Sequence, residues 1–133
     1  MSRRCSYEYS KSKIHELHLI ESSEAAVDQL IAYIDRICTT EDNAPLLLDF
    51  TQSGLPPVNY FISRINDWQQ ARPELPLGRR AVLYYGTGMT LSLLENIAHL
   101  LEFFQSPQTQ FFQKQYASEA RQWLTQASVP ARV

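Results

Sequence analysis

The chain has 133 residues, 44% of them hydrophobic and 20% charged, which fits one globular domain over residues 1–133 and excludes a disordered chain. We expect its ordered core to span about residues 7–126. Twelve Lys and Arg against fourteen Asp and Glu give a formal net charge of −2, and this weighs against a nucleic-acid partner or binding to an anionic membrane, because such proteins are usually basic. The short apolar runs weigh against membrane insertion.

The N-terminal part predicts a β-hairpin followed by a helix. Residues Ile14–Glu21 alternate apolar and polar side chains as a half-buried strand does, and Cys5–Ser10 is a weaker strand joined to it by the polar turn Lys11–Lys13. Ser22 is a suitable N-cap for the helix. Apolar residues then recur at helical spacing: Val27, Leu30, Ile31, Ile34, Ile37 and Cys38.

The middle of the chain predicts a buried strand and a second helix. Leu46–Phe50 is a nearly continuous apolar run, typical of a strand that is buried on both faces. After the turn Gln52–Gly54, Pro56 and Pro57 suit the first turn of a helix, where their missing N–H groups cost nothing. The helical stripe consists of Val58, Phe61, Ile62, Ile65 and Trp68.

The C-terminal part repeats this alternation. Arg80–Tyr85 predicts another buried strand, Gly86–Gly88 breaks it, and a third helix is expected from about Met89 to Phe104. Thr109–Gln113 predicts a short edge strand, and about Ala117–Gln126 a last helix. Because strands that alternate with helices favour parallel pairing, we expect an α/β fold with a mixed, mostly parallel five-stranded sheet and about four helices, in the order β-β-α-β-α-β-α-β-α.

Three segments carry a resemblance to a known group. The segments are Leu46–Phe50 after an amphipathic helix, then Arg80–Tyr84, then Ala120–Leu124. With them, the chain resembles the STAS/SpoIIAA-like superfamily, in particular its small bacterial STAS/SEC14-type domains. The likeness covers roughly Tyr7 to Leu124. It implies a non-enzymatic regulatory module that acts by binding another protein and needs no cofactor. Anti-sigma-factor antagonists are among the members of this superfamily.

The resemblance also implies a candidate phosphorylation site. Phosphorylated antagonists carry Asp-Ser-Ser-Gly-Leu before the second helix, and here Ser53, Gly54 and Leu55 match its last three positions. Thr51 and Gln52 replace the Asp and the first Ser, and the loop is shorter. Phosphorylation of Ser53 would add about −1.5 to −2 charges close to a helix start. Alternatively, Ser53 is simply a turn residue.

A second candidate site is the edge of the sheet where parallel strands end. Ligands of such sheets gather there, and a helix N-terminus attracts anions. We therefore consider a small-ligand or anion site formed by Asp49 with Gly86, Thr87, Gly88 and Thr90. The alternatives are a tight turn in which Thr87 caps the third helix, and an Asp49 that hydrogen-bonds to the loop after it.

The chain lacks the motifs of catalysis and metal binding that we sought. A Rossmann pattern needs a third glycine where Leu91 stands, and a hydrolase elbow needs glycines where Thr51 and Leu55 stand. His15 and His18 lie three apart on a strand, so they point to opposite faces and cannot bind one metal together. We expect no catalytic residue and no metal site, and we find no acid or histidine tied to Asp49 in the sequence.

The third helix carries more apolar residues than a helix on a sheet requires. They fill an arc of roughly 200°, whereas about 100° is enough to face a core. One candidate role for the surplus is an interface with a protein partner or a second copy, at Met89, Leu93, Leu100 and Phe103. Alternatively it is covered by a neighbouring helix or by Phe111 and Phe112, or it walls a pocket for an apolar ligand.

These observations leave three functions in order of preference. The first is a regulatory interaction module whose surface includes the third helix and the Ser53 turn. The second is a carrier or sensor of a small apolar or anionic ligand, and the third is an uncharacterised enzyme. With only Cys5 and Cys38, no apolar leader core and no long apolar run, we expect reduced thiols and a cytoplasmic protein.

Overall fold

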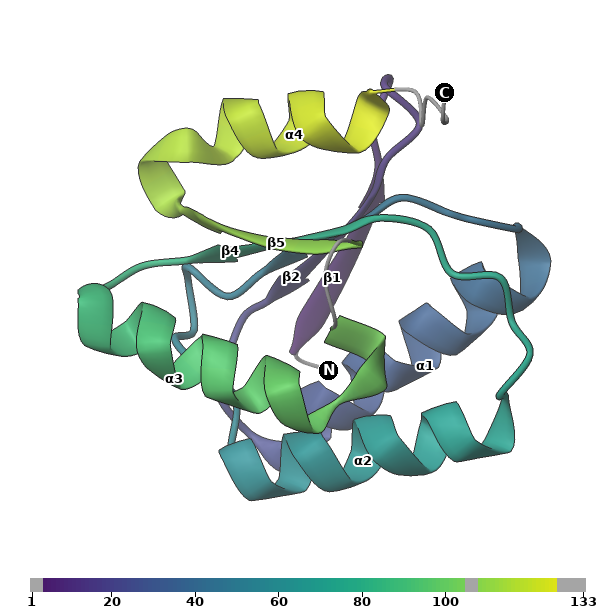
Figure 1. The fold of residues 1–133 in the computed structure, drawn as a ribbon, viewed down its shortest axis with the longest axis horizontal. Helices are drawn as coiled ribbons and strands as arrows, with labels where there is room; N and C mark the ends of the chain where they lie inside the picture. The colour runs from purple at the N-terminus through teal and green to yellow at the C-terminus, as the bar shows by residue number, and fades with distance from the viewer. Residues whose placement is uncertain (1–3, 105–107, 127–133) are drawn as a thin grey trace.

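The computed structural model describes residues 4–104 and 108–126. Its centre is a five-stranded sheet in the order β1-β2-β3-β4-β5 (Figure 1). β1 pairs antiparallel with β2, and every later pair is parallel. The strands are β1 Cys5–Tyr9, β2 His15–Leu19, β3 Leu46–Asp49, β4 Arg80–Tyr84 and β5 Thr109–Gln113.

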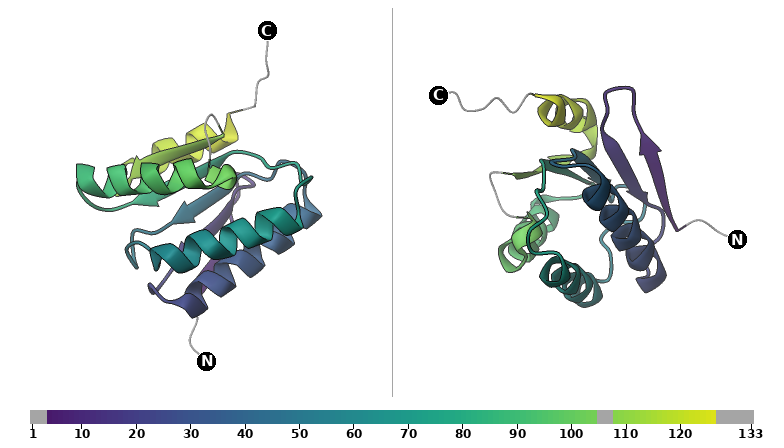
Figure 2. Two further views of the ribbon diagram at one scale, coloured as in Figure 1. Left: turned by 60° about the horizontal axis from the view of Figure 1, so that its bottom comes forward. Right: turned by 90° about the vertical axis from the view of Figure 1, so that its right-hand side faces the viewer.

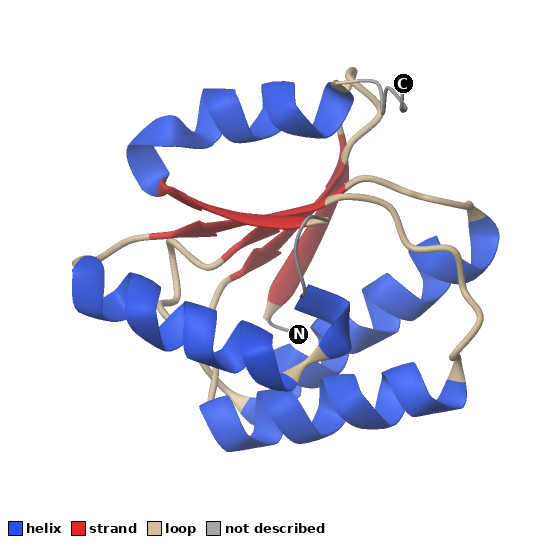
Figure 3. Cartoon of the chain, viewed as in Figure 1, coloured by secondary structure: helices blue, strands red, loops and turns tan. Residues whose placement is uncertain are grey.

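Four helices connect and cover the strands, which confirms the predicted α/β class with a mixed five-stranded sheet. Helices α1, α2 and α3 lie on one side of the sheet and α4 lies on the other (Figures 1 and 3). They are α1 Glu24–Thr40, α2 Val58–Ala71, α3 Gly88–Leu100 and α4 Ala117–Thr125, with short 3-10 turns η1 Glu102–Phe104 and η2 Lys114–Tyr116.

The sheet separates two apolar layers because its side chains alternate between faces. Leu46 and Leu48 join the larger layer beneath α1 and α2, while Leu47 faces α4. The smaller layer consists of Ile14, Leu47, Ala81, Leu83, Ala120 and Leu124. α4 packs on β3, β4 and β5, so the corresponding face of β1 and β2 extends beyond its footprint (Figure 2).

Two helix starts differ by a residue or more from the prediction. Ser23, and not Ser22, caps α1, because its Oγ accepts a hydrogen bond from the Ala26 amide at 3.1 Å. Ser22 instead donates to the Leu55 carbonyl at 2.6 Å. Pro57 is the N-cap of α2, and both prolines precede the helix. Proline removes amides that the helix would otherwise leave unpaired.

The third helix ends earlier than its apolar sequence predicts. α3 stops at Leu100, and Leu101 adopts an extended backbone that turns the chain into η1. This turn buries Phe103 completely, edge-on to Trp68 with ring centroids 5.7 Å apart. The expectation that Phe103 contributes to an interface is therefore wrong, because a side chain inside the core is not accessible to a partner.

The two cysteines of the chain lie inside the fold. Cys5 and Cys38 are both free and buried, and burial raises the pKa of the first to about 12 and that of the second to about 11. Thiolate nucleophiles need the opposite shift, so neither thiol has the environment of a reactive cysteine.

In the part of the chain that the structure describes, no helix has the length and apolar character to cross a membrane.

Candidate functional site

Four charged or titratable side chains meet on the α4 side of the sheet, and we call them the polar cluster: Glu16, His18, Asp49 and Arg121. Glu16 and His18 point to this side of β2, since Leu17 and Leu19 point into the larger core. Asp49 ends β3, directly beside His18 in the parallel register. Arg121 reaches over from α4.

His18 and Asp49 form the tightest pair of the cluster. Nδ1 of His18 lies 2.6 Å from Oδ2 of Asp49, and a carboxylate can only accept, so this nitrogen carries the proton. The other oxygen of Asp49 accepts from both the amide and the hydroxyl of Thr51, at 2.8 and 2.6 Å. The expected bond between Asp49 and its following loop is thus confirmed.

Glu16 forms the second half of the cluster. Arg121 donates two hydrogen bonds to its carboxylate, from Nε at 2.8 Å and from Nη2 at 3.0 Å. Nε2 of His18 lies 3.3 Å from the same carboxylate and 4.0 Å from Glu8, the residue opposite Glu16 on β1. The Glu16 side chain is almost completely buried although it is charged. Its bidentate partner explains how that burial is tolerated.

The pKa values follow from these contacts. Burial alone would raise the pKa of Glu16, but its hydrogen bonds and charge interaction with Arg121, together with His18, outweigh burial and lower it. For Asp49 too, burial is outweighed by hydrogen bonds from His18 and Thr51, so its pKa is lowered. The hydrogen bond to Asp49 raises the pKa of His18 against the effect of burial.

The sequence reasoning missed the contact between His18 and Asp49. Thirty-one residues separate the two, and only the parallel pairing of β2 with β3 brings them together. The prediction that His15 and His18 face opposite sides is confirmed. His15 lies on the α1 side, with Nδ1 2.8 Å from the Tyr7 hydroxyl and Nε2 2.8 Å from Glu41.

The glycine turn after β4 and Asp49 both lie at the ends of adjacent parallel strands, but they lead to different sides of the sheet. Asp49 faces the α4 side, whereas the turn leads to α3 on the opposite side of the sheet. Thr87 caps α3 by accepting from the Met89 amide at 3.2 Å, as the alternative interpretation predicted. Its carbonyl accepts from Thr90 and Leu91. Ligand or anion binding at Asp49, Gly86, Thr87, Gly88 and Thr90 stays a prediction.

Ser53 lies in the turn between β3 and α2. It is half-buried, and its hydroxyl donates to the Gly54 carbonyl at 2.7 Å. Gly54 has a positive φ of 80°, which glycine adopts without strain. Because Gly54 to Pro57 separate Ser53 from α2, its hydroxyl is not at the helix start. Phosphorylation of Ser53 stays a prediction.

The outer face of α3 carries exposed apolar side chains. Met89 is 83% exposed, Leu93 41% and Leu100 68%, and their spacing of four and seven residues places them on one face. Tyr85, just before the helix, is 72% exposed. The buried face of the same helix presents Leu94 and Ile97. The predicted interface residues other than Phe103 are therefore accessible.

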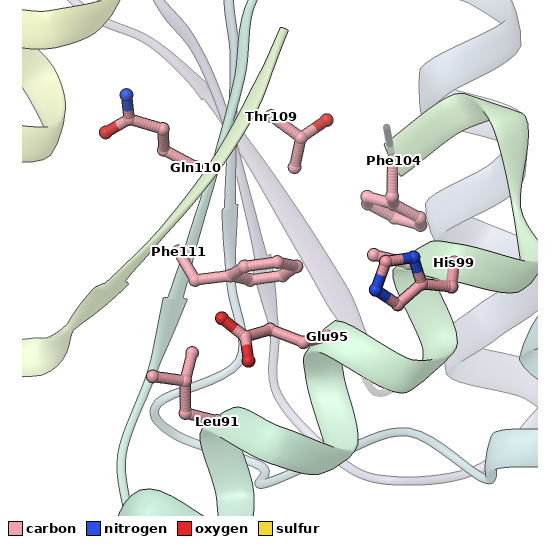
Figure 4. A pocket seen from close by; sticks show the side chains of 8 residues that line it. Leu91, Glu95, His99, Phe104, Thr109, Gln110 and Phe111 are labelled. Atoms are coloured by element: carbon pink, nitrogen blue, oxygen red, sulfur yellow. The ribbon is translucent and has the colours of Figure 1, made fainter. Parts of the chain in front are cut away.

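A cleft separates the other flank of α3 from the edge strand β5 (Figure 4). Its volume is about 680 Å³, within the range of ligand sites. Thr109 is buried in its wall, and the hydroxyl has no hydrogen-bond partner among residues 4–104 and 108–126. The lining consists of Leu91, Glu95, Ala98, His99, Phe104, Thr109, Gln110 and Phe111.

Comparison with protein-family models, with curated proteins and with solved structures found no match to this chain.

Proposed function

We propose that this protein is a non-catalytic regulatory module that binds another protein through the outer face of α3. The observation that carries the proposal is the exposure of Met89, Leu93 and Leu100 on one face of that helix. Exposed apolar groups that share a face gain free energy when a partner covers them, and such patches mark interaction sites.

The size of this patch favours a transient partner over a permanent dimer. A standard interface buries about 800 Å² on each protein, and permanent dimers usually bury more. Three apolar side chains provide only the centre of a small interface. Reversible binding of that kind suits regulation, which is also what the resemblance of the sequence to STAS/SpoIIAA-like proteins implies.

The polar cluster supports a role without catalysis. Each of its four members hydrogen-bonds to another member, so its acids and its imidazole are engaged in holding the fold. A general acid or base instead has to reach a substrate proton. Regulation would act through Ser53, because a phosphate there would replace the Ser53–Gly54 hydrogen bond with new charge in the turn that precedes α2.

Substitution of Leu100 by Asp tests this proposal. Leu100 is exposed, so Leu100→Asp should change the free energy of unfolding by less than about 0.5 kcal/mol. Tyr116→Asp, at an exposed position before α4, is the matched control. Tagged wild-type protein and both variants would be expressed in the native host, and captured proteins quantified by mass spectrometry.

We expect one protein to be enriched by the wild type and by Tyr116→Asp, and to fall at least tenfold with Leu100→Asp. The purified pair should then show the same loss of affinity by calorimetry. Equal capture by all three proteins, or no enrichment by the wild type, would count against α3 as the binding face.

A second candidate function, binding of a small ligand, is favoured by the cleft beside β5. The buried hydroxyl of Thr109 is available there to a hydrogen-bonding ligand with an apolar body. Native mass spectrometry should show a bound species that Ala98→Trp removes by filling the cleft. Ala32→Trp, at an exposed position on α1, should retain it. A wild-type protein that is always empty would exclude this alternative.

A further inference from the structure

We propose that Glu8, Glu16 and His18 bind a divalent ion of the zinc type on the α4 side of β1 and β2. The three ligand atoms come from adjacent strands and all lie within 4.8 Å of one another. One imidazole nitrogen with two carboxylates is a donor set that zinc accepts, with a water molecule in the fourth position. This site is independent of the proposed protein-binding face on α3.

The spacing of the donor atoms is close to that of a tetrahedral ion at Glu16 and slightly too wide at Glu8. Zinc–ligand bonds of about 2.0–2.2 Å place neighbouring ligand atoms roughly 3.3–3.6 Å apart. Nε2 of His18 lies 3.3 Å from Glu16 and 4.0 Å from Glu8. The Glu8 side chain is 69% exposed, so it can rotate and bring its carboxylate closer to Nε2 of His18 than the present 4.0 Å.

The imidazole is already oriented for an ion. Because Nδ1 of His18 donates to Asp49, the lone pair of the neutral ring is on Nε2, the nitrogen that faces the two glutamates. Most histidines that bind a metal have such a carboxylate on their other nitrogen. Thr51 hydrogen-bonds to Asp49, which orients His18, and Arg121 hydrogen-bonds to Glu16. Two of the three ligands, His18 and Glu16, are therefore held in place by other residues.

The charge on this part of the sheet also calls for a cation. Glu8 and Glu16 are direct partners across the antiparallel pair β1–β2, an arrangement of like charges that destabilises a sheet. With Asp49, three carboxylates face a single guanidinium, that of Arg121. With a neutral His18 the local charge is therefore −2, which one divalent ion neutralises. Each carboxylate oxygen has two lone pairs, so Glu16 can bind the ion and Arg121 together.

A bound ion would fasten the edge strand β1 to the rest of the sheet. It would link Glu8 of β1 to Glu16 and His18 of β2, beside the strands on which α4 packs. The competing explanation is that no ion binds and a protonated His18 lies between the acids. Direct metal titration distinguishes the two.

The experiment uses the full chain without an affinity tag. Cobalt(II) would be titrated as a spectroscopic substitute for zinc, followed by zinc competition, and the bound metal would be counted after dialysis. The ligand variants are His18→Gln and Glu8→Gln. His99→Gln and Glu74→Gln are the matched controls, because both residues are exposed and lie outside the proposed site.

We expect one ion per chain, the visible spectrum of four-coordinate cobalt with a nitrogen ligand, and a Tm that rises with zinc. His18→Gln and Glu8→Gln should each weaken binding at least tenfold, and the two controls should leave it unchanged. Asp49→Asn should weaken it about tenfold through the orientation of His18.

Absence of binding in the wild type, or binding that survives Glu8→Gln and His18→Gln, would overturn the proposal. Circular dichroism would check that each variant is folded. Should His18→Gln fail to fold, Glu8→Gln decides, because Glu8 is exposed and its removal leaves the contacts among the other residues intact. None of these outcomes depends on whether α3 binds a partner.

Discussion

At the scale of single residues, the fold depends on side chains that are packed so tightly that other residues would not fit in their place. Phe103 fills the space between Trp68 and Phe104 with edge-on ring contacts. Arg80 is buried with its guanidinium 4.8 Å from the centre of the Phe103 ring, and burial lowers its pKa to about 10. Such positions determine the structure more strongly than the exposed residues of α3 do.

Gly78 gives a direct test of this packing. A Cβ atom at Gly78 would overlap the backbone carbonyl of Asn43, in a loop that can move away only by breaking contacts. We expect Gly78→Ala to lower the free energy of unfolding by about 1–3 kcal/mol, as overpacking does. Gly88→Ala, where nothing lies within 4 Å, is the control and should be neutral or slightly stabilising. Urea denaturation measures both, and equal effects would contradict the packing argument.

At the scale of elements, α1 and α2 are joined by polar contacts along their solvent side. Asp35 of α1 accepts from the indole N–H of Trp68 at 2.8 Å and from Arg72 at 2.7 Å. Asp28 makes the same kind of contact two turns earlier, with Tyr60 and Arg64. These bonds fix how α2 lies against α1, and hence where α3 and η1 can pack.

The pKa of Asp35 makes this link dependent on pH. Hydrogen bonds from Arg72 and Trp68 lower that pKa below its ordinary value. A lowered folded-state pKa stabilises the protein above the unfolded pKa of about 3.9, and this contribution is lost as the pH falls through the folded value.

Asp35→Asn should therefore be less stable than the wild type at pH 7, and the difference should shrink towards pH 3. Because Asp35 is partly exposed, solvent screening keeps the effect small, about 1 kcal/mol or less. Denaturation midpoints across that pH range would measure it, with Asp67→Asn, an exposed residue of α2, as the control. A difference that stays constant with pH would contradict the role assigned to Asp35.

Local patterns predicted most elements because those patterns reflect which faces of each element are buried, one face in α1 and both faces in β3. The apolar spacing in α1 and the run Leu46–Leu48 in β3 each have one stable solution, and the structure adopts it. The end of α3 was not predictable in this way, since Leu101, Phe103 and Phe104 continue the apolar pattern of the helix. Their burial depends on Trp68 and Phe61, which belong to α2 and are distant in sequence.

At the scale of the whole molecule, the unequal layers decide where sites can form. Three helices cover one side of the sheet, while α4 leaves the α4-facing side of β1 and β2 beyond its footprint (Figure 2). The polar cluster lies at the border of that place, where Arg121 of α4 reaches Glu16 of β2, and it depends on strand pairing that no local pattern encodes. The exposed face of α3 could be predicted as a surplus of apolar residues, since helical spacing alone defines it.

The central claim is that the outer face of α3 binds a partner protein. Its most direct test is photo-crosslinking inside the native host, with a photoreactive amino acid at Leu100 and, as the control, at Tyr116. We predict one discrete crosslinked product from Leu100 and none of that mass from Tyr116. Crosslinks that are equal at both positions, or absent from Leu100, would contradict the claim.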